Sequence, residues 1–233
     1  GAGVVEAVGP GVTRFQPGQA VYGTIAGSYA EYALAQENDL QPKPASLSFE
    51  EAAAVPVGAL TAWGAVINTA EVQPGQRVLV QGAAGGVGLF MVQLACWKGT
   101  QVYGTASTAN QDFVRSLGAE PIDYSAGPVE QHVHDLDAVF DTVGGDIPQR
   151  SLPLLRRGGI FVTVAAMPPE DYGEAEGIRW SRGGRAPGEQ LAEISRLIEA
   201  GQVKPVIYRV FPLSEARQAQ ELSQTGHARG RIV

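Results

Sequence analysis

The stretch Gln76–Lys98 decides the fold class, and it reads Gln-Arg-Val-Leu-Val-Gln-Gly-Ala-Ala-Gly-Gly-Val-Gly-Leu-Phe-Met-Val-Gln-Leu-Ala-Cys-Trp-Lys. A β-branched strand stops at Gly82, a glycine-rich turn follows, and an apolar helical pattern begins after the turn. This order of strand, turn and helix is typical of the device that binds the phosphates of a dinucleotide at a helix N-terminus. Gly85 would let the backbone approach a pyrophosphate, and Gly88 would let the helix pack closely on the strand.

The turn supplies the first predicted cofactor contacts, which are Ala84, Gly85, Gly86 and Val87. Alanine (Ala83) stands at the first glycine of the G-x-G-x-x-G pattern, so the match by pattern alone is imperfect. A glycine-rich turn can also be a tight connection that binds nothing. The presence of all three elements in the required order favours nucleotide binding.

Composition bounds the class of protein. The chain has 233 residues with 44% hydrophobic content, which is enough for one large domain or two modest ones with a real core. A net charge of −7 argues against nonspecific binding to nucleic acid or to an anionic membrane. No apolar run approaches the roughly 18 residues of a membrane span. A single cysteine, Cys96, excludes an internal disulfide and a multi-cysteine zinc site, so we expect a cytoplasmic protein.

Strands and helices alternate after the glycine turn. We expect strands at 101–105, near 121–122, at 137–142 and at 159–164, and helices at 109–117, 147–155 and 188–200. Strands separated by helices of this length predict a parallel sheet with right-handed crossovers. The polar segment 167–187, rich in glycine and arginine, is expected to be a loop or a short helix over the sheet edge.

The two ends of the chain are predicted to form a second domain. Residues 1–47 have a β-rich pattern that includes a strand-like segment at Ser28–Ala35, and a helix is expected to begin after Ser48. A strand at 206–211, a helix at 213–223 and a terminal strand at 229–233 close the sequence. The fold class is therefore α/β, a doubly wound Rossmann sheet inserted in a β domain. The predicted boundaries are 1–56 and 203–233 for the β domain, and 57–202 for the nucleotide domain. Because the sequence starts abruptly inside a strand, we expect a segment ahead of Gly1.

The end of the second strand bears on the choice of dinucleotide. NAD-specific folds place an acidic residue there, about 20 residues after the glycines. Here the strand leads into Ser107 and Thr108, whose hydroxyls would donate to a 2′-phosphate, and no carboxylate stands at the tip. This favours NADP(H). Alternatively, the two hydroxyls only cap the next helix. No lysine or arginine lies between Gly99 and Val114 to settle the choice.

The strand end at 141–144 lies at the carboxyl edge of the predicted sheet, where ligands bind in such folds. Thr142, Val143 and Gly144 are therefore predicted neighbours of the nicotinamide, while Asp141 would contact it or simply cap a turn. No residue stands out as a catalytic acid or base.

Two histidines are open to a metal-binding interpretation. His132 and His134 stand beside Asp135, but an exposed polar loop is the favoured interpretation. His227 is expected on the surface near the end of a helix.

An ordered set of motifs covers the whole chain. It consists of Ala2–Gly9, Phe15–Val21, Gly27–Tyr32, Ala52–Pro56, Thr61–Trp63, Gly82–Gln93, Leu117–Ala119, Phe140–Gly145, Arg157–Gly159 and Gly230–Val233. With this set the chain resembles the zinc-independent quinone oxidoreductases, the zeta-crystallin-like group of the medium-chain dehydrogenase/reductase superfamily. In that group Ala-Ala-Gly-Gly-Val-Gly is a normal form of the glycine motif.

The resemblance implies a GroES-like partial barrel beside the Rossmann domain, and hydride transfer from NADPH to a quinone or an α,β-unsaturated carbonyl. It also implies cofactor contacts from Thr61 and Tyr124, and a homodimer paired through an edge strand around Ile160–Val164. Zinc-dependent relatives place a cysteine ligand around Val57–Gly58, and this chain has none there, so no metal is expected. The family's opening strands are missing ahead of Gly1.

That missing part leaves two alternatives beside a zinc-free NADPH-dependent reductase. One is a non-catalytic NADP(H)-binding protein. The other is the cofactor-binding fragment of a longer reductase, such as an enoyl reductase domain of a larger synthase.

Overall fold

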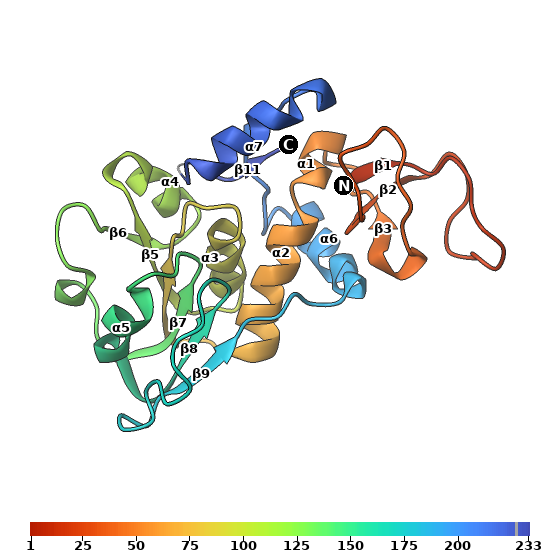
Figure 1. Cartoon of the computed structure of the whole chain (residues 1–233). Helices are drawn as coiled ribbons and strands as arrows, with labels where there is room; N and C mark the ends of the chain where they lie inside the picture. The colour runs from red at the N-terminus through yellow and green to blue at the C-terminus, as the bar shows by residue number, and fades with distance from the viewer. Residues whose placement is uncertain (227) are drawn as a thin grey trace. The chain divides into compact units, whose positions relative to one another are not determined.

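A computed structural model describes residues 1–226 and 228–233, so the predicted surface position of His227 lies outside the described residues. The chain divides into two compact units (Figure 1). Unit 1 comprises residues 1–60 and 186–233, and unit 2 comprises residues 61–185. The predicted boundaries lay at 56 and 203, so the structure assigns residues 57–60 and 186–202 to unit 1.

Unit 2 contains a six-stranded sheet in which every neighbouring pair of strands is parallel. Across the sheet the strands are β6 (Glu120–Asp123), β5 (Gln101–Ala106), β4 (Arg77–Gln81), β7 (Leu136–Asp141), β8 (Leu155–Thr163) and β9 (Arg179–Arg182). The chain runs from β4 outward to β6, then returns to β7 on the other side of β4. The strand order therefore reverses at β4, and ligands bind at the carboxyl ends of the strands at such a point. The predicted α/β fold with a parallel doubly wound sheet is confirmed.

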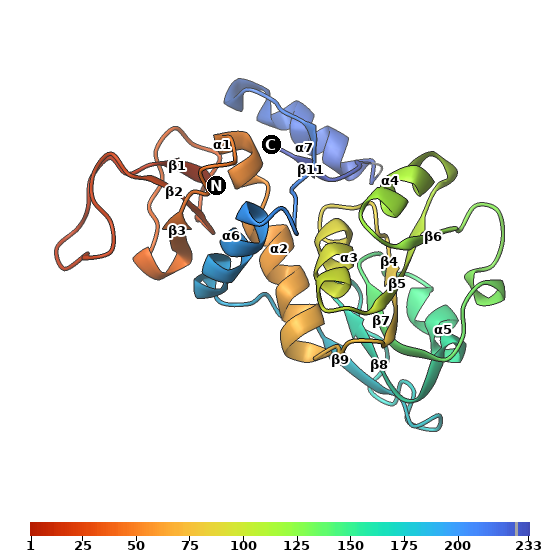
Figure 2. The same ribbon diagram turned by 180° about the vertical axis from the view of Figure 1, so that it is seen from behind.

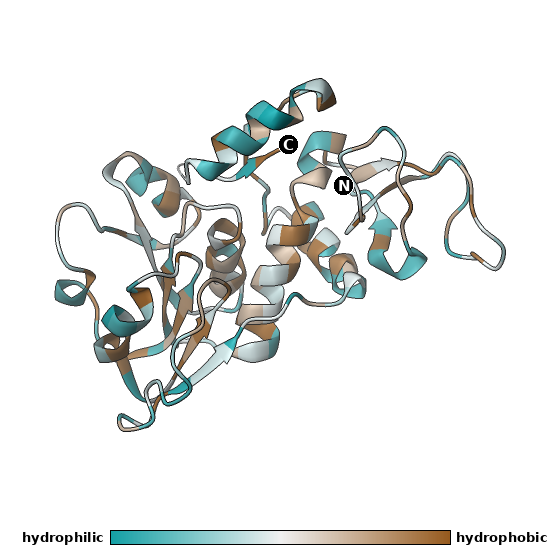
Figure 3. Ribbon diagram, in the orientation of Figure 1, coloured by the Kyte–Doolittle hydropathy of each residue, from teal (hydrophilic) through white to brown (hydrophobic). Residues whose placement is uncertain are grey.

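Helices cover both faces of this sheet. They are α3 (Gly88–Trp97), α4 (Gln111–Ser116) and α5 (Ile147–Ser151). Right-handed crossovers that run in opposite directions across a sheet place their helices on opposite faces. Helices α3 and α5 accordingly lie on opposite sides of the sheet in both views (Figures 1 and 2). Helix α3 is apolar on most of its surface (Figure 3). This agrees with the burial of residues 88–95, since a helix that is apolar all round is a buried one.

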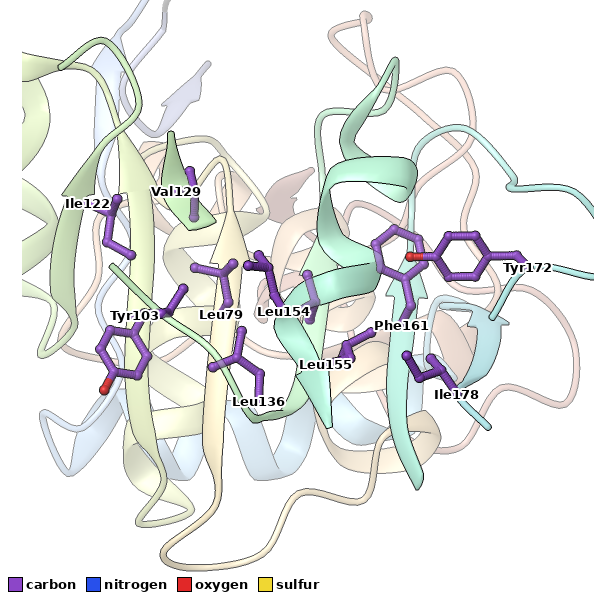
Figure 4. Packing of buried hydrophobic residues seen from close by; sticks show 12 residues of the cluster. Leu79, Tyr103, Ile122, Val129, Leu136, Leu154, Leu155, Phe161, Tyr172 and Ile178 are labelled. Atoms are coloured by element: carbon purple, nitrogen blue, oxygen red, sulfur yellow. The ribbon is translucent and has the colours of Figure 1, made fainter. Parts of the chain in front are cut away.

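One hydrophobic cluster fills a face of the sheet (Figure 4). Its residues are Leu79, Tyr103, Ile122, Val129, Val133, Leu136, Val139, Leu154, Leu155, Phe161, Tyr172 and Ile178. The parallel register aligns Leu79 with Val139 and Val139 with Phe161, so these side chains share a face by strand alternation. The rings of Phe161 and Tyr172 lie 5.2 Å apart between centroids, which extends the cluster toward the β9 edge.

The sheet edge differs from the prediction for 167–187. Residues 179–182 form β9, which pairs with β8 in the register Phe161 to Trp180. The sequence Arg-Trp-Ser-Arg carries one large apolar side chain, so it gives little strand signal by itself. Because β9 covers β8, the prediction that Ile160–Val164 is an edge strand was wrong, and the edge is β9.

Unit 1 is built from both ends of the chain. It contains an antiparallel sheet of β1 (Ala2–Val4), β2 (Ala20–Gly23) and β3 (Leu40–Pro42), and a parallel pair of β10 (Ile207–Arg209) and β11 (Arg231–Ile232). Phe15, Val21 and Leu40 form its small buried cluster.

The remaining α-helices lie within residues 49–63 and 191–224. They are α1 (Phe49–Ala53), α2 (Pro56–Trp63), α6 (Leu191–Glu199) and α7 (Ala216–Gln224). The single turns and the π-helical turn η2 are η1 (Glu37–Asp39), η2 (Gly64–Thr69), η3 (Thr108–Asn110), η4 (Val129–Gln131), η5 (Leu152–Leu154), η6 (Gly188–Gln190) and η7 (Leu213–Glu215). Ser48 and Glu51 form a reciprocal capping box at the start of α1, as its polar pattern predicts.

Helix α6 belongs with unit 1 because the Tyr22 hydroxyl of β2 reaches it. That hydroxyl donates to the carbonyl oxygen of Leu191 at 3.2 Å and lies 2.7 Å from Ser195 Oγ. The predicted boundary at residue 203 separated this helix from the strand that it contacts.

The predicted strand at Ser28–Ala35 is not formed. Tyr29, Tyr32 and Leu34 are 72%, 76% and 92% exposed, respectively. Their spacing resembles a strand, but a strand needs a ladder, and within the described ranges no strand pairs with this segment. Over the same ranges, no helix has the length and apolar character needed to cross a bilayer.

Candidate functional site

The glycine turn starts with a backbone that only glycine adopts easily. Gly82 has a φ of +77°, which is the left-handed region. A Cβ at this position would lie 2.5 Å from Thr142 Oγ1 and 2.9 Å from Val143 Cγ2. Both the conformation and the space therefore require glycine, and the turn lies directly against the loop that follows β7.

The start of helix α3 explains two further glycines. A Cβ at Gly88 would overlap the carbonyl oxygen of Gly82, and a Cβ at Gly85 would lie 3.3 Å from the same oxygen. The helix thus begins in close contact with the end of β4. The first N–H groups of a helix have no partner within the helix and carry the positive end of its dipole. The positive end of the helix dipole at the turn therefore suits an anion such as a phosphate group.

Ala83 occupies the first glycine of the pattern because the neighbouring strand makes room for its methyl group. Its N–H donates to the carbonyl oxygen of Thr105 at 3.0 Å. A Cβ at Gly104 would lie only 2.7 Å from the Cβ of Ala83. The glycine on β5 thus compensates for the alanine in the turn.

The loop after β7 is tied to the strands on both sides. Thr142 Oγ1 donates to the carbonyl oxygen of Gln81 at 2.8 Å. The buried Asp141 carboxylate accepts the N–H groups of Val143 at 2.8 Å and Gly144 at 2.9 Å. Its other oxygen accepts from Thr163 Oγ1, on β8, at 3.1 Å. Asp141 is therefore a turn cap, one of the two roles that the sequence left open.

The structure places Thr142 and Val143 against Gly82 of the glycine turn, at the sheet edge where they were predicted, and Gly144 follows them in the same loop. The Thr142 hydroxyl donates to the end of β4, which is a structural role. Val143 is 59% exposed and presents an apolar side chain beside Gly82. Gly144 is buried with a φ of +81°, and a Cβ there would lie 3.3 Å from the Cβ atoms of Ala165 and Ala166.

At the end of β5 the structure corrects the sequence argument. Ala106 pairs with Asp123 on β6, and the Thr108 hydroxyl donates to Asp123 Oδ2 at 2.6 Å. A carboxylate therefore does stand at this tip, supplied by the adjacent strand. The Thr108 hydroxyl proton is therefore used in the hydrogen bond to Asp123. Ser107 Oγ accepts a hydrogen bond from Asn110 Nδ2 at 3.2 Å, so the proton of the Ser107 hydroxyl is the one left to donate.

Sequence reasoning did not single out Asp123, which the structure places beside the end of β5. Its Oδ1 accepts the N–H of Ser125 at 2.8 Å. The hydrogen bond from Thr108, followed by the one from the Ser125 backbone, lowers the pKa of Asp123 below its usual value, so the side chain is ionised at neutral pH. The available signal was its position at a strand end, directly before Tyr124.

Tyr124 and Thr61 remain predictions. Tyr124 follows β6 and is 54% exposed, and Thr61 is a half-buried residue of α2 within unit 2. The hydrogen bonds of the described residues link neither of them to the glycine turn.

The other reactive side chains that the structure describes lie apart from the glycine turn in sequence and include His134 and Cys96. His134 pairs with Asp135 at 2.8 Å in an exposed position. Across residues 1–226 and 228–233, no group of three histidine, cysteine or acidic side chains could hold a metal. Burial raises the pKa of the Cys96 thiol, which lowers its reactivity at neutral pH.

Comparison with known proteins places the chain among oxidoreductases. A family model described as zinc-binding dehydrogenase matches residues 117–233. The mitochondrial NAD(P)H oxidoreductase RTN4IP1 of Danio rerio is 34% identical, over all of this chain and 70% of its own length. The chloroplastic NADPH-dependent alkenal/one oxidoreductase of Arabidopsis thaliana is 34% identical over all of this chain and 61% of its own length.

Part of a much longer protein is equally similar. Polyketide synthase GfsB of Streptomyces halstedii is 37% identical over all of this chain, which spans 4% of the synthase. Among solved structures, the quinone oxidoreductase of Coxiella burnetii superposes with a TM-score of 0.91 at 35% identity. That match covers 99% of this chain and 76% of the Coxiella chain.

Proposed function

Because this chain belongs to the medium-chain dehydrogenase/reductase superfamily of oxidoreductases, we propose that it reduces a quinone or an α,β-unsaturated carbonyl with NADPH and without zinc. The observation that carries the proposal is the glycine turn. Gly82 and Gly88 let the end of β4 and the start of α3 pack directly together, and the half-buried residues Gly85, Gly86 and Val87 lie at the N-terminus of that helix, where a phosphate would bind.

The cofactor, when bound, supplies the hydride. The chain's own contribution is to bind and to orient. The turn of Ala84, Gly85, Gly86 and Val87 would hold the pyrophosphate, and the tied loop 142–144 would lie beside the nicotinamide. Val143 would present an apolar surface there, which excludes water from the reacting atoms.

The cofactor proposal rests on Ser107 and Tyr124 at the 2′-phosphate. Ser107 offers a free hydroxyl proton, and Tyr124 has an exposed ring beside the same strand end. The Arabidopsis relative is named as NADPH-dependent, whereas the zebrafish relative is named for NAD(P)H, so we propose NADP(H) on the chain's own residues together with this similarity.

The zinc-free mechanism is proposed from the donor set. Zinc sites in proteins use three or four cysteine, histidine or acidic ligands. This chain has one cysteine, and Val57 and Gly58 stand where zinc-dependent relatives are expected to carry a ligand. The matching family model is described as zinc-binding, so metal analysis is a direct test.

The test is NADPH oxidation by the full chain with 1,2-naphthoquinone and with an aliphatic enone as acceptors. We expect turnover that survives chelators, and less than one equivalent of zinc per chain by metal analysis. The cofactor part of the proposal is tested separately by calorimetric titration with NADPH. Failure to bind NADPH or NADH would refute the proposed function.

A second candidate follows from the similarity to the polyketide synthase, since this chain spans a small part of that protein. The chain would then be the cofactor-binding part of a longer reductase. Binding of NADPH without turnover across quinones and enones would favour this candidate, or a non-catalytic binding protein. A cytoplasmic location stays a prediction.

A further inference from the structure

Asp123 lies where the ribose of a bound dinucleotide is expected. In dinucleotide folds the adenosine ribose sits at the end of the second strand. Here that strand is β5, and its last residue, Ala106, pairs with Asp123 on β6. The 2.6 Å hydrogen bond from Thr108 fixes the carboxylate at this end of β5.

Among the described residues, the groups that act on the Asp123 carboxylate are hydroxyls and backbone N–H groups rather than cations. Its described partners are the Thr108 hydroxyl, the backbone N–H and the hydroxyl of Ser125, and the backbone N–H of Ala126. Arg115, the nearest cation along the following helix, is paired with Asp112. A fixed negative charge accepts a hydrogen bond from a ribose hydroxyl but repels a phosphate dianion at the same place.

Resting on the cofactor site of the proposed function, we propose that Asp123 sets the choice between the two nicotinamide dinucleotides. The Asp123 carboxylate, at the end of β6, accepts a hydrogen bond from the ribose 2′-hydroxyl of NAD(H). It takes the place of the acidic residue that the end of β5 lacks. The same charge opposes the 2′-phosphate that Ser107 and Tyr124 would bind, so the preference for NADP(H) is smaller than those two residues alone would give.

The test compares adenosine 2′,5′-bisphosphate with 5′-AMP by calorimetric titration of the full chain. We expect Asp123→Asn to increase the affinity ratio of bisphosphate to AMP by about fivefold at low salt. The increase should shrink between about 0.05 M and about 0.5 M salt, because exposed charges are screened. A purely structural role would not give this salt dependence.

Three variants accompany the test. Asp123→Glu keeps the charge and should keep the ratio of the unaltered chain, whereas Asp123→Ser should shift the ratio as Asp123→Asn does. Asp171→Asn removes an exposed charge at the β8–β9 side of the sheet and should change nothing.

An unchanged ratio in both neutral variants, or an increase that is independent of salt, would overturn the role of Asp123 while leaving the proposed function intact. If the unaltered chain binds neither nucleotide, the proposed function fails instead, and the role of Asp123 fails with it.

Discussion

Gly88 begins helix α3 in contact with the carbonyl oxygen of Gly82, so a methyl group at residue 88 would overlap this oxygen. We expect Gly88→Ala to destabilise the protein by about 1–3 kcal/mol, the usual cost of forcing extra volume into a packed region. NADPH affinity should fall as well, because the helix N-terminus must move. Thermal unfolding and calorimetric titration measure the two effects.

The matched control is Gly184→Ala. Gly184 has open space where its Cβ would lie, and its φ is not in the left-handed region. An equal loss of stability in both variants would show that the contact with Gly82 is not the cause.

Asp141 is the second residue whose replacement is informative. The carboxylate receives three hydrogen bonds, from Val143, Gly144 and Thr163. Asparagine offers one oxygen and turns an amide toward the remaining donor, so we expect Asp141→Asn to lose about 1–3 kcal/mol of unfolding free energy. Urea unfolding checks this. Asp146→Asn, an exposed partner of Arg150, should change stability by less than about 1 kcal/mol.

At the scale of elements, Tyr22 joins β2 to α6 within unit 1. Replacing it by phenylalanine removes the hydrogen bonds to Leu191 and Ser195. We expect Tyr22→Phe to cost about 1–2 kcal/mol of unfolding free energy at neutral pH, because the Leu191 carbonyl and the Ser195 hydroxyl lose their partner.

The same tyrosine gives a pH dependence with a definite sign. Burial, with a further contribution from the charge of Glu199, raises the pKa of Tyr22 to about 12. The unfolded chain releases this proton near pH ~10, so the folded state holds it more tightly. The stabilisation is complete below about pH 10 and is lost as the pH rises toward about 12. Urea unfolding across this range should show the advantage of the unaltered chain over Tyr22→Phe decreasing; a constant difference would contradict it.

Which elements the sequence could predict depends on how locally each is determined. Strand β4, its turn and α3 are specified by neighbours in the chain, since Gly85 and Gly88 both lie against the carbonyl oxygen of Gly82. Strand β9 forms because it pairs with β8. The sequence of β9 is polar and contains no information about this pairing, so its pattern alone indicated a loop. Segment 28–35 has the alternation of a strand but no ladder partner among the described residues.

The candidate site divides in the same way. The glycine turn and the loop 142–144 were predicted because each follows a recognisable strand, and parallel strands end at one edge. The role of Asp123 could not be predicted, because it depends on the pairing of Ala106 with Asp123 across two strands. Sequence distance from the glycines pointed only to the end of β5.

At the scale of the whole molecule, the open edge of the sheet suggests how two copies would associate. The N–H of Gly183 donates to Thr163 on β8, and alternation along a strand then directs the N–H of Arg182 away from β8. We expect a homodimer that pairs through β9. Arg182→Pro removes the outward donor and should give a monomer, whereas Arg182→Ala should stay dimeric. Sedimentation velocity distinguishes them; a monomeric unaltered chain would contradict the homodimer.

The hydrogen bond between Tyr22 and Ser195 joins residues 173 positions apart. During synthesis, all of unit 2 leaves the ribosome between these two residues. Unit 2 is continuous in sequence and has every strand of its sheet before α6 is made, so it can fold while translation proceeds. The Tyr22 hydroxyl of the first 60 residues gains its partners on α6 only after unit 2 has been synthesised. The order in which the chain is synthesised therefore separates the two halves of unit 1 by the whole of unit 2.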